Sequence, residues 1–258
     1  MAPRAFYHYK GIDESDESMH KLMANYSIIS CSSAITPKWL REHTDARLLA
    51  NIGANSVPYW GDGVPHWDHL RSYFTDEVFF LDKDGERVES NHHKFWYLRP
   101  HLDAAKAFLD AFEMLMYDFD GLYVDMAGRG GSWWMKNDLE LPESEWGWYH
   151  NAQAGWLEFF LKEFRRRFPE KLLMTNTWGP TKGEKNKRIF GVKYPLYTRQ
   201  MMRQTTGVTI EYPQEADISF LRRVAKASHA TSIAWGEELA IPGVVMPGDL
   251  RETIGIEA

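Results

Sequence analysis

The chain has 258 residues, of which 44% are hydrophobic and 26% are charged. These fractions are ordinary for a globular protein and exclude a disordered or fibrous chain. The chain contains 30 Lys and Arg residues and 36 Asp and Glu residues, which gives a formal net charge of −6. This charge argues against a non-specific binder of nucleic acid or anionic membranes. The length is close to the roughly 250 residues of a typical (β/α)₈ barrel, so we expect one domain over residues 1–258.

The chain carries no segment that predicts a membrane span or a secretory signal. No run approaches 18 apolar residues, and the N-terminus lacks a charged region followed by an apolar one. A cytoplasmic location and a secreted or virion-associated one both remain open. The single cysteine, Cys31, excludes an intramolecular disulfide and a Cys-based zinc site.

Short apolar runs bounded by Gly, Pro, Asn or Asp alternate with helical patterns along the chain. The predicted strands are 26–30, 46–53, 77–81, 121–126, 171–178, 207–212 and 230–235. Apolar residues at three- and four-residue steps predict helices over 101–117, 151–168 and 216–230, with a short helix over 37–43. Pro169 ends the second of these helices, and three arginines occupy its last turn.

Strands that alternate with helices indicate a parallel sheet with crossover helices. A doubly wound sheet that binds a nucleotide should carry a glycine-rich turn after its first strand, and none is present. We therefore predict an α/β fold, a single (β/α)₈ TIM-type barrel. Only seven strands are identified, so either Arg4–Tyr9 supplies the eighth or the barrel has an irregular or missing strand.

In a parallel barrel, functional residues lie at the carboxyl ends of the strands. Asp125 and Glu211 end two predicted strands, and Asn51, Asn55 and Trp60 end or follow another. Carboxylates supply an acid, base or nucleophile, amides bind hydroxyl groups, and indole faces stack on sugar rings. Asp120, which precedes the strand at a turn, is interpreted as a turn residue.

Glycoside cleavage requires two carboxyl groups that face the scissile bond from different elements. Asp125 and Glu211 are the predicted catalytic pair, with Glu237 or Glu238 as the replacement if Glu211 points elsewhere. A structural alternative for Asp125 is a pairing with Arg129.

Tryptophan accounts for 11 residues, and many of them stand beside Gly, Pro, Asn or Asp. They either form a ligand surface or pack beneath the loops. The predicted substrate-binding residues are Trp60, Tyr123, Arg129, Trp133, Asn176, Trp178, Trp235 and Glu237.

The sequence lacks the motifs of two other classes of enzyme. A metal-dependent amidohydrolase barrel would show His-x-His after its first strand, and an esterase would show a G-x-S-x-G elbow; neither is present. We expect no metal and no cofactor.

The segment Phe119–Asp125, with the sequence FDGLYVD, resembles a motif of glycoside-hydrolase-like TIM-barrel families, among them the endo-α-1,4-polygalactosaminidase-like family and the hypothetical glycosyl hydrolase type. The preceding Trp96–Pro100 and its following helix resemble the segment before that motif. The resemblance covers about residues 95–126 and implies a carbohydrate-active barrel in which the Asp125 position is functional. It does not supply a substrate, and Met126, Ala127 and Gly128 stand where those families often have further polar residues.

The sequence therefore predicts a glycoside hydrolase that cleaves a polysaccharide or glycoconjugate with two carboxylates. The alternative is a carbohydrate-binding or structural barrel without catalysis, for example a component of a surface or virion assembly. A phosphate-binding barrel is a third interpretation, but Gly236 is the only glycine near the required position.

Overall fold

The computed structural model describes residues 6–9, 28–31, 41–42, 44–53, 56–58, 72–89, 95–125, 139–177, 204–211, 231–235 and 252–256. Its strands are β1 (Phe6–Tyr9), β2 (Ile28–Cys31), β3 (Arg47–Gly53), β4 (Ser56–Pro58), β5 (Phe95–Tyr97), β6 (Gly121–Asp125), β7 (Leu172–Thr177), β8 (Gly207–Glu211), β9 (Thr231–Trp235) and β10 (Glu252–Ile256). Its helices are the 3₁₀ helix η1 (Asp76–Val78), α4 (Leu102–Leu115) and α6 (Glu143–Arg167).

The strands form one mixed and mostly parallel sheet, in the order β2-β1-β10-β9-β8-β7-β6-β3-β4-β5. Strands β1, β2, β3, β6, β7, β8 and β9 pair in parallel wherever they meet, and β10 is antiparallel to both β9 and β1. An additional pairing joins β2 to β3. The pairings of eight strands therefore lead back to their starting point, while β4 and β5 extend the sheet beyond the end of β3.

Most of the predicted strands and helices are present in the structure, with the following corrections. Residues 77–81 do not form a strand, because 76–78 make a 3₁₀ turn and only Phe79 and Leu81 form isolated bridges. The N-terminal strand is present as β1, whereas β4, β5 and β10 were not predicted. The helix predicted to begin at 151 begins at Glu143 and ends, as expected, just before Pro169. The helix predicted over 216–230 lies outside the described residues.

Both faces of the central strands are buried, which explains why these strands read as near-continuous apolar runs. One face carries the core cluster of Ile28, Leu49, Tyr123 and Met174, and we call it the cluster face. The opposite face carries Leu48, Ala50, Ile52, Leu122, Val124 and Leu173, each at most 4% exposed.

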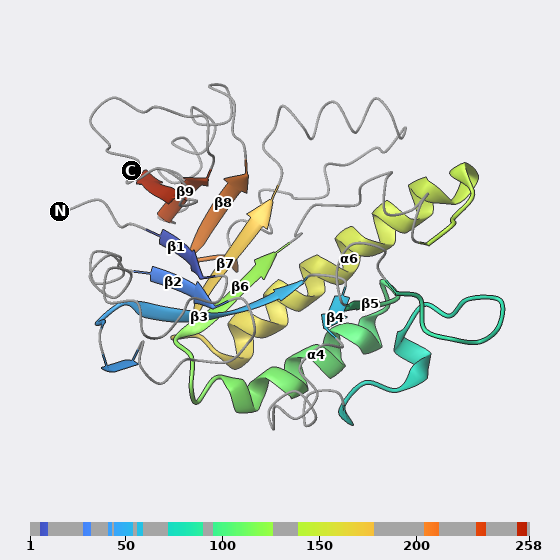
Figure 1. Ribbon diagram of the computed structural model, residues 1–258, viewed down its shortest axis with the longest axis horizontal. Coiled ribbons are helices and arrows are strands. Elements are labelled where there is room, and N and C mark those ends of the chain that lie inside the picture. The colour runs from blue at the N-terminus through green and yellow to red at the C-terminus, as the bar shows by residue number, and fades with distance from the viewer. Residues whose placement is uncertain are drawn as a thin grey trace.

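Helices α4 and α6 lie side by side along β3, β6 and β7 (Figure 1). Aromatic side chains join them: the ring of Phe108 on α4 meets the rings of Trp156 and Phe160 on α6 edge to face, at centroid distances of 5.9 and 6.3 Å. The indole of Trp156 stacks on Phe160 with centroids 5.3 Å apart. The apolar stripes predicted from the sequence therefore form a single aromatic layer.

Candidate active site

The predicted acids end two parallel strands at the same edge of the sheet. Asp125 is the last residue of β6 and Glu211 the last residue of β8, and only β7 lies between these strands. Figure 1 shows β6, β7 and β8 running in the same direction, so their carboxyl ends meet at one edge.

The pairing register fixes the levels of these residues. Asp125 pairs with Gly53 of β3, Asn176 of β7 with Thr209 of β8, and Glu211 with Trp235, the last residue of β9. Four predicted site residues, Asp125, Asn176, Glu211 and Trp235, therefore stand at or next to the carboxyl end of four consecutive strands.

Tyr123 lies two residues before Asp125, on the cluster face. Its side chain is 0% exposed and belongs to the apolar cluster with Leu49 and Met174. The structure thus shows Tyr123 packed in the core, and its role in substrate binding stays a prediction. The other predicted binding residues, Trp60, Arg129, Trp133, Trp178 and Glu237, lie outside the described residues.

The first half of the FDGLYVD segment has a structural role at the opposite end of β6. Phe119 is 2% exposed in the core. Asp120 is not only a turn residue: its carboxylate accepts hydrogen bonds from Arg41 (3.0 Å), Arg47 (3.2 Å) and the backbone amide of Leu48 (2.8 Å). Its backbone amide donates to the Leu48 carbonyl at 2.8 Å and its carbonyl accepts from Leu172 at 2.9 Å. One residue thus links β3, β6 and β7.

These contacts set the charge state of Asp120. Burial favours its neutral form and raises its pKa, but the hydrogen bonds from the Leu48 amide and the Arg41 guanidinium outweigh burial, so the pKa lies below its ordinary value of 3.8. Asp120 is therefore an ionised structural group and lies at the edge of the sheet away from Asp125.

Gly121 explains the glycine of the segment. A Cβ atom built there would overlap the backbone carbonyl of Leu172 on the paired strand β7. The backbone of β7 approaches too closely for any side chain, so packing requires a glycine at this position. The functional role predicted for Asp125, at the other end of the segment, stays a prediction.

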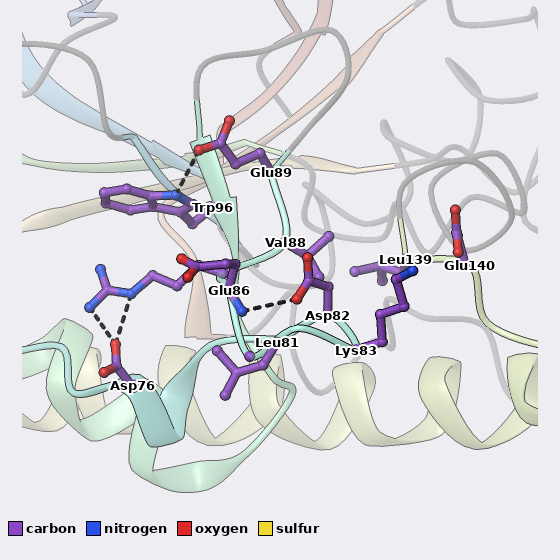
Figure 2. A pocket seen from close by; sticks show the side chains of 12 residues that line it. Asp76, Leu81, Asp82, Lys83, Glu86, Val88, Glu89, Trp96, Leu139 and Glu140 are labelled. Atoms are coloured by element: carbon purple, nitrogen blue, oxygen red, sulfur yellow. Dashed lines mark hydrogen bonds and ion pairs between the residues drawn. The ribbon is translucent and has the colours of Figure 1, made fainter.

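A separate groove of about 1200 Å³ lies beside β5, outside the predicted site. Figure 2 shows Asp76, Asp82, Glu86 and Glu89 around it with Trp96. Its complete lining is Asp76, Leu81, Asp82, Lys83, Gly85, Glu86, Arg87, Val88, Glu89, Trp96, Leu139 and Glu140.

Arg87 holds one wall of this groove in place. Its guanidinium lies 4.1 Å from the ring centroid of Phe79 and 4.9 Å from that of Trp96, and it donates to Asp76 at 2.6 and 2.9 Å. The indole of Trp96 donates to Glu89 at 3.3 Å (Figure 2). Of the charged groups nearest Trp96, Arg87 thus pairs with Asp76 and Glu89 binds the indole, which accounts for both as structural contacts.

Among the residues that the structure describes, no group of three or more His, Cys, Asp and Glu side chains is arranged to hold a metal ion. No helix in the same part of the chain is both long and apolar enough to cross a membrane.

No protein-family model matches the chain, and no curated protein matches it either. Solved structures similar to it include the glycoside hydrolase domain of PelA from Pseudomonas aeruginosa, at 12% identity and a TM-score of 0.43, covering 94% of this chain and 98% of that domain. An α-amylase from Lactobacillus plantarum follows at 10% identity and a TM-score of 0.49, covering 87% of this chain and 56% of the amylase. A β-galactosidase from the psychrophilic Marinomonas ef1 shares 8% identity at a TM-score of 0.46, covering 81% of this chain and 40% of the enzyme. All three are glycoside hydrolases by description, and at these TM-scores the similarity carries no conclusion about substrate or mechanism.

Proposed function

We propose that this chain is a glycoside hydrolase, built on a (β/α)₈-type barrel, that cleaves a polysaccharide or glycoconjugate with Asp125 and Glu211 as its two carboxylates. One observation carries the proposal: both acids end parallel strands at one edge of the sheet, with a single strand between them. This position is where barrel enzymes hold their catalytic groups.

The spacing of the strands suits a pair of carboxylates. Neighbouring strands lie about 4.8 Å apart, so two strands separated by one other are roughly 10 Å apart at the backbone. Glycoside hydrolases hold their carboxyl groups about 5–10 Å apart. The proposal requires that the side chains of Asp125 and Glu211 converge over β7 to bring their carboxyl groups into this range.

The proposed chemistry divides two tasks between the acids. One carboxylic acid protonates the glycosidic oxygen as the bond from the anomeric carbon to that oxygen breaks. The other carboxylate attacks the anomeric carbon or removes a proton from the attacking water. The separation between the two groups decides which of these occurs.

The barrel in this proposal consists of the eight strands whose pairings return to their start, with β10 as the irregular strand. Around its mouth, the proposed substrate-binding residues are Trp60, Tyr123, Arg129, Trp133, Asn176, Trp178, Trp235 and Glu237. Amides and carboxylates would bind sugar hydroxyls, and indoles would stack on sugar rings.

The test is a digest of neutral, acidic and amino-sugar polysaccharides, read as newly formed reducing ends, with wild type and Asp125→Asn. The variant keeps the shape of the side chain but loses its charge. We expect activity to fall by about 10²-fold or more, because acid–base catalysis contributes roughly 10²–10⁴-fold. An unchanged rate in the folded variant removes Asp125 from the mechanism. Saccharide binding by the wild type without any cleavage supports a non-catalytic carbohydrate-binding barrel instead.

A further inference from the structure

Strand β3 runs beside β6 and presents two residues at the level where the proposed site begins. Asn51 pairs with Tyr123, and Gly53 pairs with Asp125. Because side chains alternate along a strand, Asn51 and Gly53 lie on the same face as Leu49, which belongs to the core cluster.

Towards the carboxyl end of β3, the residues on the cluster face become partly exposed, whereas those on the opposite face stay buried. Leu49 is 0% exposed, and Leu48, Ala50 and Ile52 on the opposite face are at most 4% exposed. Asn51 and Gly53 are partly exposed. The burial of the cluster face therefore ends at the carboxyl end of β3, where Asn51 carries a partly exposed carboxamide.

Packing alone does not explain an asparagine at position 51. Placing an amide against the apolar layer of Leu49 and Tyr123 costs free energy unless its polar atoms find partners. An amide both donates and accepts hydrogen bonds, which suits a hydroxyl group that does the same. Gly53, which pairs with Asp125, carries no side chain and so adds no bulk at that level of β3.

We propose that Asn51 is a ligand-binding residue of this site, whose carboxamide hydrogen-bonds a hydroxyl group of the saccharide unit held next to Asp125, with Gly53 providing room for that unit. This inference rests on the proposed function and extends the site from β6 and β8 to β3.

The experiment measures saccharide binding by isothermal calorimetry, with an oligosaccharide of whichever polysaccharide the wild type cleaves. The Asp125→Asn chain serves as the parent, so that cleavage does not interfere. Asn51→Ala and the size-matched Asn51→Leu are introduced into it. Asn151→Ala is the matched control, since Asn151 is an exposed residue on α6.

Loss of one hydrogen bond to a neutral group should weaken binding by about 3- to 10-fold in both Asn51 variants. Asn151→Ala should bind like its parent, and the melting temperatures of all variants should stay close together. Asn51 variants that bind as tightly as the parent overturn this inference. So does a large loss of melting temperature without a loss of affinity, because that result assigns Asn51 to packing.

The two proposals fail in different ways. If the wild type cleaves a saccharide and Asp125→Asn does not, but the Asn51 variants keep their affinity, only the role of Asn51 is wrong. If the wild type neither cleaves nor binds any saccharide of the panel, the proposed function is wrong, and the role of Asn51 falls with it.

Discussion

Asp120 links three strands, because its carboxylate binds β3 and its backbone carbonyl binds β7 beside its own strand β6. Its partners Arg41 and Arg47 are 40% and 67% exposed, so these ion pairs are screened by water and contribute little. The hydrogen bond from the Leu48 amide is the stronger contact, because it satisfies a backbone donor at the start of β3 with a charged acceptor. Asp120 is therefore a stability residue that happens to lie in a segment resembling an active-site motif.

Asp120→Asn should lower the free energy of unfolding at pH 7 by about 1–3 kcal/mol, the usual contribution of a hydrogen bond to a charged group. The folded pKa is depressed, so the stabilisation is present above the ordinary pKa of 3.8 and is lost as the pH falls through the folded pKa. The gap between wild type and variant, measured by urea unfolding, should therefore shrink below about pH 4.

The exposed neighbour Asp118 offers the control, since Arg41 binds its backbone carbonyl and not its carboxylate. Asp118→Asn should change stability by less than about 0.5 kcal/mol. A gap between wild type and Asp120→Asn that stays constant from pH 7 to pH 3 would contradict the assigned role of the Asp120 charge.

At the scale of the elements, the register of β6 against β7 depends on a glycine. Gly121→Ala should cost about 3 kcal/mol or prevent folding, because the methyl group overlaps a backbone carbonyl that cannot move without breaking the pairing of the two strands. Thermal unfolding followed by circular dichroism measures this loss.

The same substitution on α6 should have the opposite sign. Gly155 is exposed in the interior of the helix, and a Cβ atom there meets no other atom within 4 Å. Gly155→Ala should raise stability by about 0.5–1 kcal/mol through helix propensity. If the Gly121→Ala protein is as stable as the Gly155→Ala protein, the conclusion that β7 leaves no room for a side chain at position 121 is wrong.

Arginine 165 joins elements at the far end of α6. Its guanidinium donates to the carbonyls of Gln204 (3.1 Å), Pro169 (2.9 Å) and Lys171 (3.0 Å) and to the hydroxyl of Thr206 (3.0 Å). Burial lowers the pKa of Arg165 from its ordinary value, with Glu170 acting in the opposite direction. The end of the helix is thereby tied to the starts of β7 and β8, and a lysine could not make these four contacts.

For the whole molecule, β10 joins the two ends of the chain by pairing with β1 and β9. A chain ending at residue 250 would lack β10 and leave the edges of β1 and β9 unpaired. Unpaired strand edges promote association. We expect a lower melting temperature and concentration-dependent aggregation, measured by light scattering.

The matched control for this truncation removes only Glu257 and Ala258, which follow β10. That chain should behave as the full-length protein does. A chain ending at residue 250 that stays monomeric with an unchanged melting temperature would show that β10 does not hold the sheet together.

Elements with a local signal can be predicted from the order of the residues alone. The strands ending at Asp125 and Glu211 and the helices α4 and α6 could be predicted, because apolar periodicity and breakers such as Pro169 act over a few residues. The position of both acids at strand ends follows from the same signal. The parallel arrangement follows from the alternation of strands and helices.

Other features depend on contacts between residues that are far apart in the chain. Residues 76–81 have the composition of a strand, but they pair only through isolated bridges and begin with a 3₁₀ turn. The pairing of β10 with β1 joins residues more than 240 positions apart, and no local pattern encodes such a contact. Asp120 and Gly121 take their roles from β3 and β7, and Asn51 takes its place from the register with β6. Each of these features depends on which strand lies next to the residue. The packing of the whole sheet determines which strands are neighbours.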